Sequence, residues 1–317
     1  MDTGTKLKKI RQALTILEDS LKRCVICPRR CGVDRTAGEK GYCRAPLEAV
    51  VYSYLAHHGE EPALSGESGS GTIFFTHCNM KCVYCQNYYF SQLDNGQTVS
   101  TEKLASIMLN LQKMGCHNIN LVSPSHFVPQ ILSALEIAIE KGLNIPIVYN
   151  TSGYDLIDTI RLLDGIVDIY LPDMRYADNS MAKKYSDAAD YVERNRESVS
   201  QMYSQVGDLV VNEDGIAQKG LIIRLLVLPG NISGTAETLK FIKENISGRT
   251  YLSIMSQYYP TFKAYSFKEI SRGITADEYK NIVDEARLLG LNNGWIQKGP
   301  GPTDEKFLGT NIKPKNG

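Results

Sequence analysis

Short β-rich runs alternate with windows of helical periodicity from residue 72 onward, and this alternation constrains the fold more than any other feature. Six runs are predicted as strands, at residues 72–76, 118–122, 146–150, 167–171, 221–228 and 251–255. Helices are predicted between and after them, at about 101–114, 127–141, 155–163, 180–205, 235–246 and 275–289. Because strands joined through helices need right-handed crossovers, the pattern predicts an α/β protein with a parallel sheet. Such a sheet is doubly wound or curled, and six units favour a partial (β/α)6 TIM-like barrel.

The residues before this alternation differ in character and predict an N-terminal extension, 1–71, ahead of a barrel with a C-terminal tail, 72–317. Apolar residues at steps of three and four predict an amphipathic helix over 5–22. Residues 24–71 are loop-rich, with many glycines, and one strand is expected near 50–54. The tail is rich in Gly, Pro and Lys and is expected to wrap the surface or to be mobile.

The charge balance of the chain limits its partners. Lys and Arg number 35, as do Asp and Glu, so the formal net charge is 0. This balance removes the electrostatic argument for a nucleic-acid or anionic-membrane partner. No apolar run reaches the roughly 18 residues of a membrane span, and residues 1–9 are polar and charged. We therefore expect a cytoplasmic protein, in which spaced cysteines bind metals more often than they form disulfides.

Seven of the eight cysteines lie between Cys24 and Cys85, in two groups of different spacing. The second group, Cys78, Cys82 and Cys85, directly follows the first predicted strand, so a single loop can bring its thiols together. Three thiolates are one short of a closed tetrahedral zinc site and one short of saturating a four-iron cubane. One metal position stays open in such a site, as it does in catalytic zinc sites, so the spacing predicts chemistry at this loop.

Polar side chains follow several other predicted strands at their carboxyl ends. In both candidate folds the βα loops converge there and carry the functional site. The candidate binding residues at these positions are Ser123, Ser125, Asn150, Ser152, Asp173 and Arg175.

A C-x3-C-x2-C loop after the first strand of a six-unit βα barrel resembles the radical S-adenosylmethionine (SAM) superfamily, over about residues 72–260. The resemblance implies that Cys78, Cys82 and Cys85 hold a [4Fe-4S] cluster whose fourth iron is chelated by SAM. It implies that Tyr84 packs near the adenine. It also implies that a one-electron reductant such as flavodoxin or ferredoxin starts the cleavage of SAM, and that a 5′-deoxyadenosyl radical then abstracts hydrogen from a substrate.

Within the superfamily the chain resembles pyruvate formate-lyase activating-enzyme-like proteins, through Cys-Gln-Asn at 85–87 and Asp-Met-Arg at 173–175. Ser-Pro-Ser-His at 123–126 stands in place of the usual Gly-Gly-Glu that binds the methionine amino group, and its two serines are expected to do the same job. Arg175 replaces the usual lysine and keeps the positive charge. Arg224, in the fifth predicted strand, is another candidate for binding the SAM carboxylate.

The first cysteine group matches the four thiols of a closed metal site and consists of Cys24, Cys27, Cys31 and Cys43. A structural zinc site and a second iron-sulfur cluster that relays electrons or binds substrate both fit, and the spacing alone does not separate them. Metal-free thiols are the third interpretation. The segment has too few apolar residues to fold without a cross-link, which favours a bound metal over metal-free thiols.

Two lesser features have ordinary interpretations. His57 and His58 precede Glu60 and Glu61, but adjacent residues on a strand point to opposite faces and do not easily chelate one ion. A structural or polar role is expected for them. Cys116 stands alone and is expected to be a small buried hydrophobe.

The sequence thus predicts a radical SAM oxidoreductase. One hypothesis is an activating enzyme that makes a glycyl radical in a protein partner, a glycyl radical enzyme. A second keeps the chemistry but has a small molecule, peptide or RNA as substrate. A third, of another class, is a non-catalytic zinc-binding interaction module, for which the neutral charge argues against nucleic acid as partner.

Overall fold

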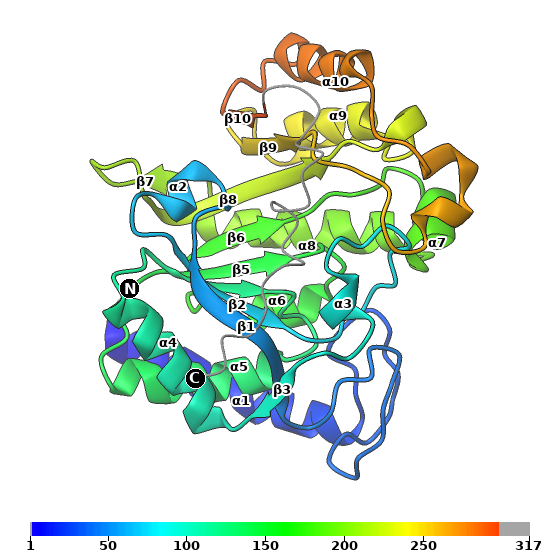
Figure 1. Ribbon diagram of the computed structural model, residues 1–317. Helices are drawn as coiled ribbons and strands as arrows, with labels where there is room; N and C mark the ends of the chain where they lie inside the picture. The colour runs from blue at the N-terminus through cyan, green and yellow to red at the C-terminus, as the bar shows by residue number, and fades with distance from the viewer. Residues whose placement is uncertain (1, 298–317) are drawn as a thin grey trace.

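The computed structural model describes residues 2–297 and contains a single ten-stranded sheet. Its strands are β1 (Ala49–His57), β2 (Ser70–Phe75), β3 (Gln97–Val99), β4 (Ile119–Val122), β5 (Ile147–Thr151), β6 (Ile169–Pro172), β7 (Val210–Val211), β8 (Ala217–Leu226), β9 (Tyr251–Met255) and β10 (Gly294–Ile296). Their order across the sheet is β10-β9-β8-β6-β5-β4-β2-β1-β3, and β7 pairs with β8 beside this path (Figure 1). The C-terminal tail, which is expected to wrap the surface or to be mobile, lies outside the described residues from residue 298 onward.

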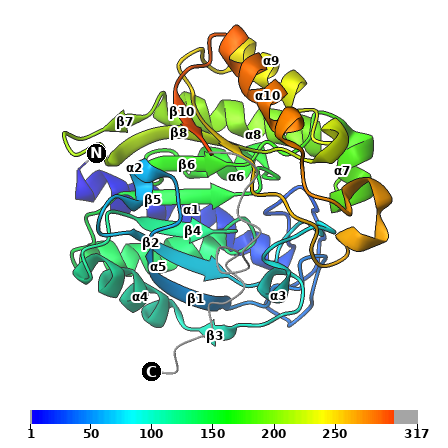
Figure 2. The ribbon, with the colours of Figure 1, turned by 45° about the horizontal axis from the view of Figure 1, so that its top comes forward.

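The helices are α1 (Thr3–Lys22), α2 (Pro62–Ser65), α3 (Tyr88–Ser91), α4 (Thr101–Lys113), α5 (Val128–Glu140), α6 (Ile157–Leu162), α7 (Asn179–Ser186), α8 (Tyr191–Val206), α9 (Thr235–Asn245) and α10 (Ala276–Leu288). The longer ones surround the outside of the curved sheet, as Figure 2 shows. Within residues 2–297, no helix is long and apolar enough to cross a membrane.

Six strands, β2, β4, β5, β6, β8 and β9, run parallel to one another in chain order and form the partial barrel. The predicted α/β fold class is therefore confirmed. Side chains alternate across each strand. In β4, Ile119 and Leu121 pack outward into the main hydrophobic core with the helices, whereas Asn120 and Val122 face the barrel interior.

The single helix predicted over 180–205 is wrong, because the structure has two helices, α7 and α8, in this interval. The first ends at Asp187, whose φ of 52° and ψ of 40° place it in the left-handed region. A residue in that conformation cannot continue a right-handed helix and commonly ends one. The apolar periodicity carries no trace of this break, because both helices bury residues against the same core.

The N-terminal segment shares its core with the barrel. α1 packs against α5, with Ile10 and Leu14 in the main core cluster. β1 pairs antiparallel with β2, and β3 pairs antiparallel with β1, so these strands extend the sheet at one edge. The boundary expected between residues 71 and 72 falls within β2.

The short helix α2 closes the amino-terminal end of the barrel. Its Ala63 and Leu64 pack inside against apolar side chains of three barrel strands, namely Val148, Ile169, Leu171, Ala217 and Ile222. Figure 1 shows α2 at one end of the strands and α3 and α7 at the other, which is the carboxyl end. The barrel therefore has a filled apolar floor, and the polar groups described below lie above it.

Candidate functional site

The loop that carries Cys78, Cys82 and Cys85 leaves the carboxyl end of β2 and is fixed by backbone hydrogen bonds on two sides. The amide of Val83 donates to the carbonyl of Tyr185 at the end of α7 (2.8 Å), and the amide of Lys263 donates to the carbonyl of Val83 (2.9 Å). The loop is thus held between α7 and the segment after β9.

Each thiol of this loop has a hydrogen-bonding group beside it. The sulfur of Cys82 accepts from Nη1 of Arg175 (3.1 Å) and from the hydroxyl of Ser186 (3.0 Å). The Met80 amide donates to the sulfur of Cys78 (3.4 Å), and the hydroxyl of Ser91 lies 3.2 Å from the sulfur of Cys85. Hydrogen bonds to sulfur are characteristic of thiolates that ligate iron-sulfur clusters and tune their potentials.

The thiols also shift one another's proton affinity. Burial raises the pKa of the Cys78 thiol to about 12 and that of Cys85 to about 11, and the charge of Cys82 adds to both shifts. Three adjacent thiolates of which one is buried need positive charge close by, and a metal cluster supplies it. The donor set therefore fits the [4Fe-4S] cluster that the sequence predicts.

Four of the residues predicted to bind the cofactor meet in one network at the carboxyl ends of β5, β6 and β8. Asp173 accepts from Nη2 of Arg175 (2.6 Å) through one oxygen and from Nε of Arg224 (2.8 Å) through the other. Arg224 also donates through Nη2 to the side-chain oxygen of Asn150 (2.7 Å). Burial opposes ionisation of Asp173, but the two guanidinium groups outweigh it and lower the pKa of this carboxyl.

The other predicted residues lie around this network without joining it. The hydroxyl of Ser125 lies 3.3 Å from that of Thr151, and the carbonyl of Ser152 accepts from Tyr191. Ser123 has a left-handed backbone, with φ of 59°. The hydroxyl of Tyr84 is 2.6 Å from that of Tyr176, so its polar end faces protein groups.

Sequence reasoning missed Glu60, Glu61 and Asn120, which the structure places inside the barrel. The Glu60 side chain is 9% exposed, and its Oε2 lies 3.7 Å from Nη1 of Arg224. Glu61 is 8% exposed, and Asn120 is fully buried. The signal available was the pair of acids directly after a strand and before Pro62, but such residues on a loop are ordinarily solvated.

The four N-terminal thiols also gather. Burial raises the pKa of Cys27, and the charges of Cys43, Cys24 and Cys31 raise it further, so all four lie close together. The backbone amides of Arg29 and Ala45 lie close enough to Cys27 and Cys43 to counteract part of the rise in the pKa of these thiols. The Tyr42 amide donates to the sulfur of Cys31 (3.3 Å), as in metal-binding knuckles. All eight cysteines are free.

Arg29 joins this cysteine group to the loop after β2. Its Nε donates to the carbonyl of Asn79, next to Cys78 (2.8 Å), and its guanidinium lies 3.7 Å from the ring centroid of Tyr42. The two thiol groups are therefore neighbours.

Within residues 2–297, no three His, Cys, Asp or Glu side chains converge on the geometry of a site for one ion.

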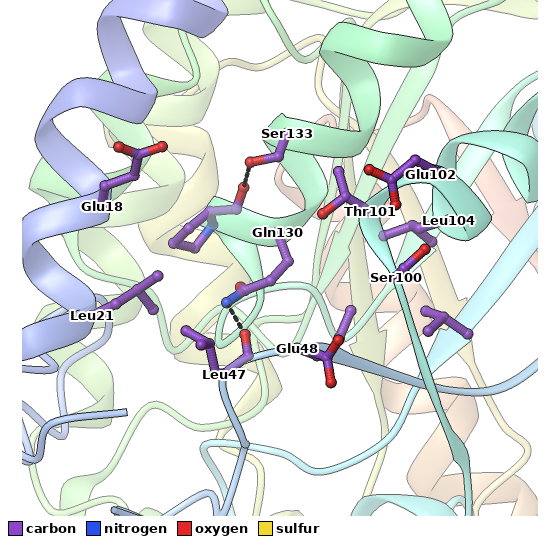
Figure 3. Close-up of a pocket in the computed structure, with 13 residues that line it drawn as sticks. Glu18, Leu21, Leu47, Glu48, Ser100, Thr101, Glu102, Leu104, Gln130 and Ser133 are labelled. Carbon is purple, nitrogen blue, oxygen red and sulfur yellow. Dashed lines mark hydrogen bonds between the residues drawn. The ribbon is translucent and has the colours of Figure 1, made fainter. Parts of the chain in front are cut away.

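A pocket of about 370 Å³ lies elsewhere, outside the barrel. Figure 3 shows Glu18 and Leu21 of α1, Glu102 of α4 and Gln130 of α5 around it, with the Gln130 side chain donating to the Leu47 carbonyl. None of its lining residues belongs to either thiol group or to the Asp173 network. This pocket therefore lies apart from both thiol groups and from the Asp173 network.

Fold and site together define a class of protein: a partial (β/α)6 barrel that presents three thiols from the loop after its first parallel strand. The Radical SAM superfamily model matches residues 72–197, which supports the predicted resemblance to that superfamily. The match begins in β2 and ends in α8, so it includes the cysteine loop, Asp173 and Arg175.

Comparison with individual proteins gives distant relatives. "Uncharacterized protein MJ0674" of Methanocaldococcus jannaschii is 29% identical over 286 residues, which cover 87% of this chain and 78% of the relative. SuiB of Streptococcus suis, solved with the precursor peptide SuiA, is 14% identical with a TM-score of 0.49 over 70% of this chain and 47% of that one. HydG, the FeFe-hydrogenase maturase of Carboxydothermus hydrogenoformans, is 13% identical with a TM-score of 0.45 over 73% of this chain and 54% of its own length. The chain thus spans about half the length of these two solved structures.

Proposed function

We propose that this protein binds a [4Fe-4S] cluster through Cys78, Cys82 and Cys85 and cleaves SAM reductively. The observation that carries the proposal is the fixed loop at the carboxyl end of β2, in which all three thiols, of which Cys82 is buried, have hydrogen-bonding neighbours. The superfamily match over residues 72–197 supports it. When bound, the cluster and SAM would supply one-electron cleavage of the C5′–S bond, with methionine leaving and a substrate hydrogen atom moving to C5′ to give 5′-deoxyadenosine.

The protein's own part is to bind and to orient. Arg224 and Arg175 are the cations available to a SAM carboxylate, because Asp173 fixes both guanidinium planes without burying an unpaired charge. Asn150 holds the far side of Arg224. The backbone of Ser123 and the side chain of Ser125, after β4, are available to the methionine amino group.

The resemblance to activating enzymes supports a glycyl radical enzyme as the target, with flavodoxin or ferredoxin as the one-electron donor. A glycyl radical in a candidate partner is detected by its EPR signal. Formation of 5′-deoxyadenosine without that signal for every candidate partner tested would direct the search to small molecules, peptides or RNA.

The decisive experiment compares Cys82→Ala with Cys116→Ala after anaerobic reconstitution. Cys116 is a buried cysteine that accepts none of the hydrogen bonds described at either thiol group and serves as the matched control. We expect Cys82→Ala to lose about four irons, the EPR signal that shifts with SAM, and 5′-deoxyadenosine formation. Cys116→Ala should keep all three. Equal iron content in both variants would exclude the proposed ligand set.

We also propose that Cys24, Cys27, Cys31 and Cys43 form a second metal site, because their four thiols are gathered and the Tyr42 amide donates to the sulfur of Cys31. Metal analysis identifies its occupant: about four irons with one zinc indicate a structural zinc, and about eight irons indicate a second cluster. Four irons without zinc would contradict the proposed site.

A further inference from the structure

A second polar layer lies inside the barrel, between the Asp173–Arg224 pair and the apolar floor formed by α2. Glu60 and Glu61 immediately precede α2 and therefore enter the barrel with it. A series of polar contacts connects this layer with the cysteine loop: Cys82 with Arg175 (3.1 Å), Arg175 with Asp173 (2.6 Å), Asp173 with Arg224 (2.8 Å), and Arg224 with Glu60 (3.7 Å). The two glutamates thus stand at the inner end of a chain of alternating charges.

The layer is short of positive charge. Asp173 takes the short hydrogen bonds of both arginines, so Glu60 is left with a contact to Arg224 that is longer than a hydrogen bond. Glu61 faces the same guanidinium and the neighbouring Glu60. His57 lies 3.9 Å from Glu60, but burial lowers the pKa of its imidazole, so it brings no compensating charge at neutral pH. When both glutamates are ionised, three carboxylates share two cations, and the raised pKa values of Glu60 and Glu61 reflect this shortage of positive charge together with their burial.

Polar atoms in this layer also lack partners. Oε2 of Glu61 and both amide atoms of Asn120 are buried without a hydrogen bond of normal geometry, although Asn120 faces the Glu60 carboxyl closely enough to counteract the rise in its pKa. Burial raises the pKa of both glutamates. A buried polar group left unpaired destabilises the folded protein by about 1–3 kcal/mol, so a ligand that forms hydrogen bonds with these atoms would be stabilised here.

We propose that Glu60 and Glu61 bind a cationic nitrogen of the substrate, an ammonium or guanidinium group, with the Asn120 amide oxygen as a further acceptor. A cation satisfies the acceptor atoms and the charge deficit together, whereas a neutral hydroxyl or water satisfies only the atoms. The inference rests on the proposed function, because it names the substrate class of the same barrel. The substrate would lie with its cationic end beyond Arg224 and its reacting end toward the cysteine loop.

The test uses n-butylammonium as the probe and 1-butanol as its neutral counterpart. Binding is measured by calorimetry on the full-length, reconstituted protein, without reductant and with saturating SAM, so that the SAM sites are filled and SAM is not cleaved. We expect the amine to bind to wild type and at least tenfold more weakly to Glu61→Gln. Glu67→Gln, at an exposed acid two residues after α2, should bind it as wild type does.

Equal affinity of wild type and Glu61→Gln for the amine would overturn the inference, as would equal binding of 1-butanol, which indicates a site for water or neutral groups. If Glu61→Gln does not fold, Asn120→Asp is the second variant: added negative charge should tighten amine binding, and unchanged binding would overturn the inference. Failure of the proposed function is distinguishable, because wild-type protein that binds the amine but forms no 5′-deoxyadenosine after reduction would contradict only the SAM-cleaving activity.

Discussion

Nη1 of Arg175 lies 3.1 Å from the sulfur of Cys82 while Nε and Nη2 of the same guanidinium bond to Asp173. One planar group therefore connects the cysteine loop after β2 with the carboxyl end of β6. Only arginine has donors in this fork geometry, which is why this side chain can bond to Asp173 and to Cys82 at the same time.

Arg175→Lys should make the reduction potential of the cluster more negative by on the order of 60 mV, because fewer donors then stabilise the reduced, more negative state. A shift of this size corresponds to a tenfold change in a one-electron equilibrium. An EPR-monitored redox titration measures it. Arg161→Lys, at an exposed arginine of α6, is the control, and an unchanged potential in Arg175→Lys would show that the bond to Cys82 does not persist in the loaded protein.

Leu64→Ala should destabilise the fold by about 2–5 kcal/mol, because Leu64 is fully buried among barrel residues and its truncation leaves a cavity in the floor. Urea unfolding gives the free energy. Leu288→Ala removes a leucine that is 83% exposed and should change it by less than about 0.5 kcal/mol. Similar values for the two variants would mean that α2 is not part of the cooperative core.

Gly153→Ala should lower the free energy of unfolding more than Gly142→Ala does, although both glycines have positive φ, 73° and 97°. An added Cβ at Gly142 meets nothing within 4 Å, so only the backbone strain of about 1–2 kcal/mol applies. A Cβ added at Gly153 would lie 2.2 Å from Nδ2 of Asn195 and 2.3 Å from the carbonyl oxygen of Asp173. Losing the Asn195 hydrogen bonds adds about 1–3 kcal/mol. Equal urea midpoints would contradict this contact.

Stability should fall as the pH drops below 6.5, partly through His126. Burial lowers the pKa of this histidine from 6.5 to about 3, and its Nε2 bonds to the carbonyl of Thr76 (2.8 Å) as the neutral ring. As the pH falls, His126 takes up a proton in the unfolded chain before it does so in the folded protein. The stabilisation that neutral His126 provides is therefore complete above pH 6.5 and is lost progressively toward pH 3. The loss should reach about 2 kcal/mol between pH 8 and pH 5. His126→Gln should flatten this dependence, the exposed His58→Gln should not, and parallel profiles for all three proteins would exclude His126 as the source.

The barrel could be predicted because its determinants are local. Runs such as 146–150 combine β-branched and apolar residues between turn signals, and β5 forms there at Ile147–Thr151. Likewise, polar residues at strand ends must converge in a parallel barrel, so Asn150 and Asp173 do meet through Arg224.

The glutamate layer could not be predicted because its determinants are distant in sequence. Glu60 and Glu61 follow β1, which returns antiparallel along β2, and α2 then carries them beneath residues of β6 and β8. No residue near position 60 indicates that β1 pairs antiparallel with β2 and so brings this loop into the barrel. The break between α7 and α8 was missed for a different reason, because it depends on a single left-handed residue, Asp187, of a type that also occurs inside helices.

The ends of the sheet have a consequence for how copies of this chain meet at high concentration. The outermost strands of the described sheet, β3 and β10, are three residues long each. Such short edges offer too few free amide and carbonyl groups to template a strand from another molecule. We therefore expect the folded chain to resist edge-to-edge aggregation, which suits a protein that must be concentrated and reconstituted before its metal content can be measured.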